Sequence, residues 1–247
     1  ERTLVCLNEY KGTISEAEIS PDNVICVATS QARDAENGKE FFAGVEAENG
    51  FRFKVLSGRD EARMSFIGSL LPGMEPSNHA VVDIGGGSTE FVTAKDGRSI
   101  DLGSVRFTER YLKSDPVTDK EFSVCLNEID NKLKDLVDWR NSIRLGMQML
   151  AVAGTATTLA SWHLRLSEFD AAEVEKVQLT SGNLLQMVND LKRMTVRERC
   201  DQVGIDPKRA DVLLAGAMIL WRTMEKLDFP NCRISSRGLR YGVLIDS

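Results

Sequence analysis

The segment with the clearest chemical capacity reads Asp-Ile-Gly-Gly-Gly-Ser-Thr-Glu and runs from Asp83 to Glu90. Three consecutive glycines let the backbone adopt positive φ angles and approach a ligand closely, and successive N–H groups can form a concavity that favours anions. The two acidic residues flank the turn on adjacent strands, so their carboxylates could face a metal at its mouth. The alternative is a plain glycine hairpin, in which the glycines serve only the turn. We predict a metal site at Asp83 and Glu90, and phosphate contacts from Gly85, Gly86, Gly87 and Ser88.

A second run of small residues, Ala-Val-Ala-Gly-Thr-Ala-Thr-Thr-Leu at 151–159, follows an apolar strand pattern. Small residues there allow close backbone approach, and the N-terminus of the following helix would favour a phosphate. We predict phosphate contacts from Gly154 and Thr155. Tight packing of the helix on the strand accounts for the same residues equally well.

Two charged residues near predicted helix starts could serve the same chemistry. Glu61, in the segment Ser-Gly-Arg-Asp-Glu-Ala, falls in the first turn of a helix, where the dipole favours the ionised carboxylate. An ionised Glu61 could orient and polarise an attacking water, although acidic residues also occur there merely as helix caps. Arg33 could clamp a phosphate with two parallel hydrogen bonds, or pair with a neighbouring carboxylate such as Asp34.

Other familiar catalytic arrangements find little support in the sequence. Its only histidines are His79 and His163, which disfavours a histidine-rich zinc site and a Ser-His-Asp triad. The glycine loop also lacks the Lys-Ser/Thr ending of a Walker P-loop. Any metal should therefore be a hard cation held by carboxylates and water.

Charge and hydropathy limit the classes of partner that the protein could bind. The chain of 247 residues carries a formal net charge of −6, which argues against sequence-independent binding to duplex nucleic acid. Residues 191–247 are nevertheless net basic and could meet a polyanion locally. The longest apolar run, 212–221, is too short for a bilayer span of about 20 residues. Without a signal-peptide pattern or paired cysteine spacings, we expect a cytoplasmic protein with reduced thiols.

Alternating elements predict an α/β fold. The hairpin that carries the glycine loop has strands at 80–84 and 89–93, followed by a third strand of the same layer. A break near 72–79 predicts two domains, 1–78 and 79–247, with a cleft between them. The remaining predictions are strands at 24–28, 51–55, 149–153 and 233–236, helices at 39–49, 59–71, 181–193 and 206–227, a helix behind a capping box at Thr118, and turns at 154–158 and 238–242.

Taken in order, these motifs resemble one known family. The set comprises Ala-Thr-Ser-x-Ala-Arg-x-Ala-x-Asn from residue 28, Ser-Gly-x-Asp-Glu-Ala from 57, the glycine loop, Gly-Thr-Ala-Thr-Thr-Leu-Ala from 154 and Gly-Leu-Arg-x-Gly from 238. It is similar to the exopolyphosphatase/guanosine-pentaphosphate phosphatase family along nearly the whole chain. The resemblance implies two ribonuclease-H-like domains of the actin-like ATPase fold with the active site in the interdomain cleft. It also implies a Mg²⁺-dependent hydrolase that releases a terminal phosphate from polyphosphate or guanosine pentaphosphate.

The resemblance assigns roles to individual positions. Glu61 matches the carboxylate that activates the attacking water, and Arg33 matches a phosphate-binding arginine on the opposite domain. Asp83 and Glu90 match acidic residues of the phosphate loop near the metal. The cradle for the phosphate matches Gly85, Gly86, Gly87 and Ser88.

The sequence also departs from the family pattern. The family begins with a hairpin carrying Asp-x-Gly-Ser-Asn, a second phosphate loop that this chain does not show, and the stretch 11–22 is short, so we expect an incomplete first domain. Tyr241 stands where Glu is usual, and Ala153 where Gly is usual. Two alternatives stay open, namely a non-catalytic binder of polyphosphate or alarmone and a small-molecule kinase or nucleotidase of the same superfamily. We expect a homodimer.

Overall fold

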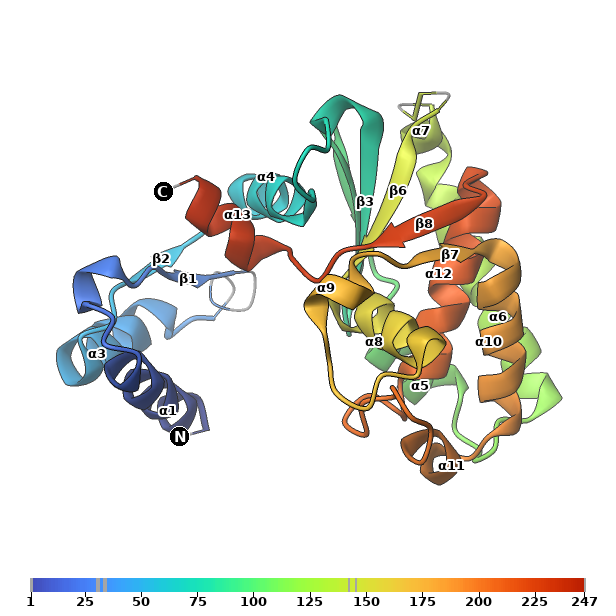
Figure 1. Cartoon of the computed structure of the whole chain (residues 1–247), viewed down its shortest axis with the longest axis horizontal. Helices are drawn as coiled ribbons and strands as arrows, with labels where there is room; N and C mark the ends of the chain where they lie inside the picture. Colours follow the sequence, from blue (N-terminus) through green and yellow to red (C-terminus); the bar gives the residue numbers. More distant parts are fainter. Residues whose placement is uncertain (1, 30–31, 33–34, 142, 145, 247) are drawn as a thin grey trace.

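The computed structural model describes residues 2–29, 32, 35–141, 143–144 and 146–246. Its strands form two sheets, each packed with helices, which confirms the α/β expectation (Figure 1). The smaller sheet pairs β1 (Cys26–Ala28) in parallel with β2 (Phe53–Val55). The larger sheet has six strands in the order β5-β4-β3-β6-β8-β7.

The larger sheet has the strand order of a ribonuclease-H-like domain. An antiparallel meander of three strands is extended in parallel from β3 through β6 and β8, and β7 adds an antiparallel edge. The strands are β3 (His79–Ile84), β4 (Thr89–Thr93), β5 (Gly97–Ile100), β6 (Gln148–Val152), β7 (Gln178–Thr180) and β8 (Asn231–Ile234). The central strands are apolar on both faces because helices cover both.

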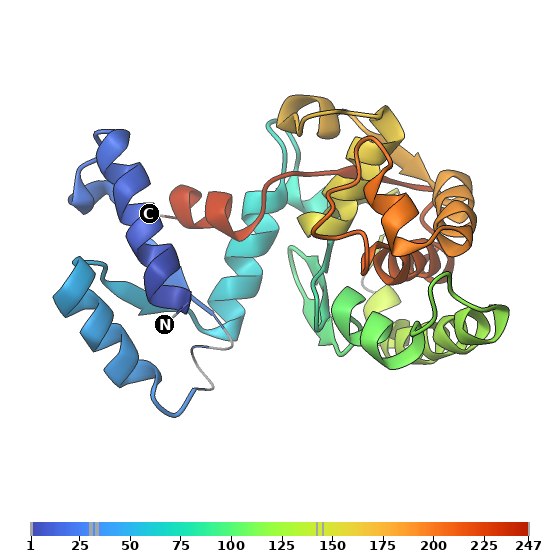
Figure 2. The ribbon, with the colours of Figure 1, turned by 90° about the horizontal axis from the view of Figure 1, so that it is seen from below.

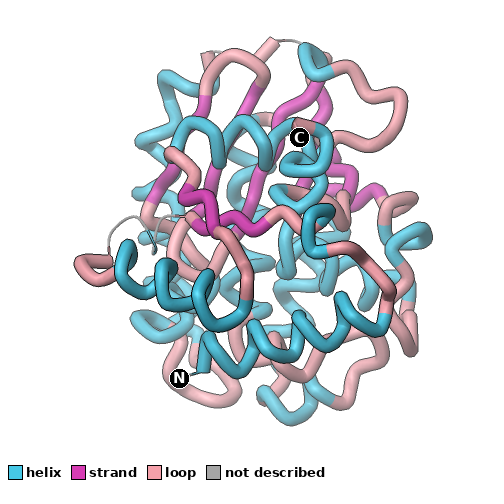
Figure 3. Tube along the Cα trace, turned by 90° about the vertical axis from the view of Figure 1, so that its left-hand side faces the viewer, coloured by secondary structure: helices cyan, strands magenta, loops and turns pink. Residues whose placement is uncertain are grey.

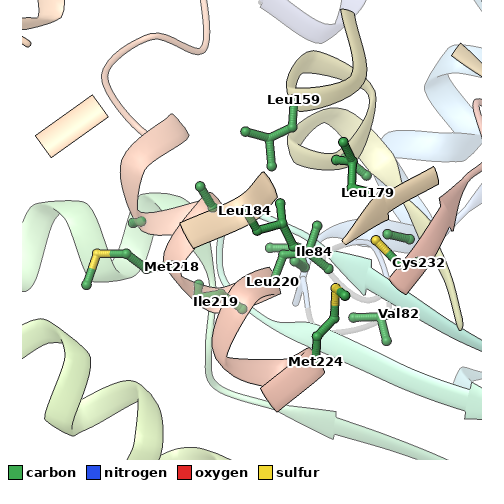
Figure 4. Packing of buried hydrophobic residues seen from close by; sticks show 14 of the residues in the cluster. Val82, Ile84, Leu159, Leu179, Leu184, Met218, Ile219, Leu220, Met224 and Cys232 are labelled. Carbon is green, nitrogen blue, oxygen red and sulfur yellow. The ribbon is translucent and has the colours of Figure 1, made fainter. Parts of the chain in front are cut away.

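The main core lies on one face of this sheet. Val82 and Ile84 of β3 point into it and meet helices that include α12 (Leu213–Leu227), whose side chains are largely buried (Figure 4). The other helices around this part of the sheet are α5 (Ser104–Tyr111), α6 (Asp119–Leu133), α8 (Ala153–Leu164) and α10 (Ser181–Arg193). Shorter elements connect them, namely η2 (Pro76–Asn78), η3 (Lys134–Leu136), α7 (Val137–Arg140), α9 (Ala171–Val174) and α11 (Val196–Cys200).

The opposite face of the large sheet packs against α4 (Gly58–Ser69). Phe66 of α4 is buried there against Val81 of β3 and Val92 of β4. Because alternate residues of a strand point to opposite faces, odd-numbered β3 residues face α4 and even-numbered ones face the main core. Asp83 therefore lies on the α4 side.

The small sheet belongs to an N-terminal unit with a modest core. α1 (Arg2–Glu16) and α3 (Gly38–Asn49) pack together beside β1 and β2, and η1 (Pro21–Asn23) joins α1 to β1. The buried members of this core are Leu7, Val45 and Phe51. Figure 3 shows this unit from its outer side. α1 was not predicted because its apolar residues are too sparse to form a clear helical stripe.

The last helix, α13 (Leu239–Ile245), returns to the first unit and packs on α4 (Figure 2). A Cβ atom on Gly242 would overlap the Met64 carbonyl oxygen, so the two backbones touch. Arg63 donates two hydrogen bonds of 2.6 Å to the carboxylate of Asp246. The prediction of a turn at 238–242 is therefore wrong beyond Gly238, since packing against α4 stabilises a helix there. The domain boundary at 78/79 stays a prediction.

Two other predicted boundaries are wrong. The long helix begins at Leu213, not at Asp206, because turns occupy 206–212 and the buried Arg199 donates to the Ala210 carbonyl (3.3 Å) within them. Residues 154–158 form the first turns of α8 instead of an exit turn. Within the described ranges, none of the helices combines the length and apolar character needed to cross a membrane.

Candidate active site

The glycine loop is a tight hairpin between β3 and β4 that places two carboxylates side by side. The Gly85 N–H donates to the Ser88 carbonyl oxygen at 3.0 Å and closes the turn. In the antiparallel register Asp83 stands directly opposite Glu90, so both side chains lie on the same face of the sheet. The Glu90 Oε1 atom accepts hydrogen bonds from Ser88 Oγ (2.7 Å) and Ser99 Oγ (2.8 Å), which fix that carboxylate.

A third carboxylate reaches this face from α4. Ser57 caps the helix by accepting the Asp60 N–H at 3.1 Å, which places Glu61 in the first turn. Burial raises the pKa of Asp83 to about 6, and the negative charges of Glu90 and Glu61 add to the effect. A hydrogen bond from Ser65, one turn after Glu61, opposes it. Glu61, Asp83 and Glu90 therefore share one electrostatic environment.

The backbone of the loop is held from its other side by α5. The Ser104 N–H donates to the Gly85 carbonyl oxygen and the Arg106 N–H to that of Gly86, both at 3.0 Å. In a trans peptide the N–H points opposite to the C=O. The amides that follow these carbonyls are thus turned away from α5, which packs on the main-core face, and towards the face that carries Glu61.

The N–H groups of Gly86, Gly87 and Ser88 have no hydrogen-bond acceptor within the described part of the chain. Three such donors in sequence, open on the side of the carboxylates, form a site for an anion. The chemistry available is that of a phosphate held by backbone amides beside a carboxylate that can orient water. This arrangement favours the phosphate-loop reading over a plain glycine hairpin.

Comparison with known proteins identifies the family of the chain. The family model described as the Ppx/GppA phosphatase family matches residues 1–247. The chain belongs to this family. Exopolyphosphatase 2 of Mycobacterium tuberculosis is 34% identical over 92% of this chain and 73% of its own length. A bifunctional 3-dehydroquinate synthase/phosphatase of Fusobacterium nucleatum is 32% identical over 91% of this chain, which spans only 35% of that protein.

Two further relatives extend the comparison. A guanosine-5'-triphosphate,3'-diphosphate pyrophosphatase of Pseudoalteromonas atlantica is 26% identical over 99% of this chain and 48% of its own length. The solved Ppx/GppA enzyme of Aquifex aeolicus superposes with a TM-score of 0.84 at 29% identity, covering 100% of this chain and 82% of that one. The resemblance noted in the sequence and the actin-like two-domain fold that it implied are confirmed.

Ppx/GppA proteins are metal-dependent, and the donor set of this chain fits a hard cation. Within the described residues there is no group of three or more His, Cys, Asp or Glu side chains that could hold a metal. Asp83 and Glu90 supply a pair of carboxylates instead, and Mg²⁺ is commonly held by one or two carboxylates with the rest of its shell water. A cation there would also relieve the repulsion that raises the pKa of Asp83.

The second small-residue run is organised differently from the first. Thr155 is buried at 4% exposure, and it packs against Gly216 of α12. Gly154 lies under the guanidinium of Arg209, which occupies the place that a Cβ atom would take. Packing therefore accounts for the Thr155 side chain, and a ligand contact from Gly154 or Thr155 stays a prediction.

One predicted site residue cannot be placed, and the structure adds three residues that the sequence did not reveal. Arg33 lies outside the described residues. Sequence reasoning missed Ser65, although its spacing of four from Glu61 puts both on one helix face. It also missed Ser99, which reaches Glu90 only through the β4–β5 register. Arg209 carries no local sequence signal, since a turn region brings it to α8.

Proposed function

We propose that this Ppx/GppA chain hydrolyses the terminal phosphoanhydride bond of inorganic polyphosphate or of guanosine pentaphosphate. The observation that carries the proposal is a loop of amides without a described acceptor beside the Asp83 and Glu90 carboxylates, with Glu61 near enough for its charge to raise the pKa of Asp83. The names of the M. tuberculosis and P. atlantica relatives support these two substrate classes. No described feature reads a guanine base, so both substrates belong to the proposal.

In this proposal the loop holds the phosphoryl group that is transferred. The N–H groups of Gly86, Gly87 and Ser88 bind its non-bridging oxygens, where charge must be stabilised during transfer. Mg²⁺ at Asp83 and Glu90 would supply additional neutralisation of that charge when bound. The Ser88 and Ser99 hydroxyls both donate to Glu90 Oε1 and hold that carboxylate in position.

Glu61 acts on the water. Its carboxylate accepts a hydrogen bond from a water molecule, orients the oxygen in line with the scissile bond and takes up the proton as the new P–O bond forms. The bridging P–O bond breaks on the opposite side, and its electron pair leaves with the shortened chain or nucleotide. α4 sets the position of Glu61 because it packs on the same sheet face that carries the loop.

Phosphate release from polyphosphate and guanosine pentaphosphate, measured with Mg²⁺, tests the proposal. We expect Glu61→Gln to lower kcat by about 100-fold or more, the usual contribution of a general base, with KM nearly unchanged. Asp60→Asn is the matched control, because it alters a neighbouring carboxylate that is engaged with Ser57 at 2.7 Å. Release by Glu61→Gln at the rate of the unchanged protein would contradict the role of Glu61.

The same measurements separate the rival functions. Tight binding of polyphosphate in calorimetry without any release would favour a non-catalytic binder. Turnover of ATP only when a small-molecule acceptor is added would favour a kinase. A homodimer and a cytoplasmic location also belong to the proposal, and light scattering of the purified protein tests the first.

A further inference from the structure

The third peptide of the glycine loop is held by a side chain alone, whereas main-chain N–H groups of α5 hold the first two. The Gly85 and Gly86 carbonyls accept main-chain N–H groups of α5, which many sequences could provide, and the Ser104 hydroxyl adds a longer bond of 3.3 Å to Gly85. The Gly87 carbonyl oxygen instead accepts the Nε–H of Arg106 at 2.8 Å. The orientation of the Gly87–Ser88 peptide therefore depends on the identity of residue 106.

That peptide carries the N–H of Ser88, which of the three amides without a described acceptor is the nearest to Glu90 along the chain. With the Gly87 carbonyl drawn towards α5, the Ser88 N–H must point to the opposite side, where Glu61 and Asp83 lie. Glycine on the N-terminal side leaves this peptide free to rotate, because Gly87 lacks the Cβ atom that would restrict it. The hydrogen bond from the Arg106 side chain thus restricts a peptide rotation that glycine at position 87 would otherwise allow.

Arg106 is itself held in place. Its Nη2 atom lies 3.4 Å from Asp101 Oδ1, an exposed ion pair that adds to the hydrogen bond from Nε. Gly103, which precedes α5, allows α5 to approach the glycine loop closely, since a Cβ atom at Gly103 would overlap the Gly86 carbonyl. Arg106 and Arg110 both line a cavity of about 600 Å³ beside Gly86 and Gly87. Only Arg106 of this pair has a hydrogen bond to the loop among the described residues.

We propose that Arg106 is a positioning residue that fixes the Gly87–Ser88 peptide and keeps the Ser88 N–H aimed at the transferred phosphate. The inference deepens the proposed function and rests on it. In this inference Arg106 acts through the loop, because its Nε donates to the Gly87 carbonyl oxygen. Arg110 provides a matched control with the same charge, the same helix and the same cavity.

The kinetic test compares Arg106→Ala, Arg106→Lys and Arg110→Ala in Mg²⁺-dependent phosphate release. We expect Arg106→Ala to lower kcat about 10- to 100-fold with KM changed less than about threefold, because a misaimed donor spoils alignment more than binding. Arg106→Lys should not restore kcat, since lysine keeps the charge but loses the donor at Nε. Restoration by lysine, or an equal loss of kcat in Arg110→Ala, would show a charge effect and overturn the inference.

A second readout does not depend on activity. Amide NMR spectra of the full chain, recorded with and without inorganic orthophosphate, report directly on the Ser88 N–H. We expect Arg106→Ala to shift the Ser88 resonance and to weaken its response to orthophosphate, while Arg110→Ala leaves both unchanged. An unshifted Ser88 resonance in a folded Arg106→Ala protein would overturn the inference. If the unchanged protein released no phosphate at all, the proposed function would fail and this spectrum would still test the positioning role.

Discussion

Ionising Asp83 should destabilise the metal-free fold, and the size of the effect follows from its pKa. The pKa is raised to about 6 by burial and by Glu90 and Glu61, against about 3.9 in an unfolded chain. A raised acid pKa means that stability is fully present below pH 4 and is lost as the pH rises through 6. This shift of about two pKa units lowers the free energy of unfolding by about 3 kcal/mol at pH 8 and by about 0.5 kcal/mol at pH 4.

Asp83→Asn removes the charge and should abolish this pH dependence. In chelator, we expect the variant to gain about 3 kcal/mol over the unchanged protein at pH 8 and about 0.5 kcal/mol at pH 4, on top of any constant offset from the amide. Urea unfolding followed by tryptophan fluorescence, to which the buried Trp139 contributes, measures both values. Asp135→Asn, which removes an exposed carboxylate on η3, is the control.

Metal addition completes the test. Mg²⁺ should stabilise the unchanged protein at pH 8 and should stabilise Asp83→Asn much less, because a ligand raises stability only where it binds the folded state. The reasoning would be refuted if the difference between Asp83→Asn and the unchanged protein were the same at pH 4 and pH 8. Such a result would mean that burial and the neighbouring carboxylates do not raise the pKa of Asp83 in the folded protein.

Three further predictions concern the supporting structure. Gly242→Ala should lower the free energy of unfolding by about 1–3 kcal/mol and also reduce phosphate release, because its Cβ would push α13 away from the helix of Glu61. Unchanged urea unfolding and unchanged phosphate release would contradict the contact. Arg63→Met should cost at most about 1 kcal/mol in urea unfolding, since the partly exposed ion pair with Asp246 is screened, and a loss of several kcal/mol would show a larger role. Hydrogen bonds from Thr118 lower the pKa of Glu121 to about 2, so its stabilisation is present above about pH 4.5 and fades towards pH 2. Glu121→Gln should therefore weaken the fall in the free energy of unfolding between about pH 4.5 and pH 2, measured by urea unfolding. The same pH dependence in the variant and the unchanged protein would refute this.

The hairpin and its carboxylates could be predicted because their signal is local. Alternating apolar residues define β3 and β4, and the glycine run fixes the turn, so the pairing of Asp83 with Glu90 follows from counting along the strands. The predicted helices at 39–49 and 181–193 likewise match α3 and α10 to within a residue. In each case the apolar residues that identify the element in the sequence are also the residues that the fold buries, wholly or in part.

The parts that escaped prediction depend on contacts distant in sequence. Gly238 and Gly242 read as turn residues, yet Gly242 is where α13 meets the backbone of α4. Arg106 is one basic residue among many until the fold brings it to the Gly87 carbonyl. The late start of α12 depends on Arg199, whose hydrogen bonds to the Leu191 and Ala210 carbonyls no local rule could foresee.

The packing of α13 on α4 also dictates the order in which the molecule can be assembled during synthesis. Leu56, which precedes the helix of Glu61, and Met64, which lies within that helix, share a buried cluster with Val243. That contact joins residues separated by most of the chain, and such contacts form late because the loop between them must first be closed. A nascent chain can build the large sheet from residues 79–234 before residue 243 has left the ribosome. The helix of Glu61 thus gains its last buried neighbour only after the glycine loop can have formed, so the two parts of the proposed site are expected to fold one after the other.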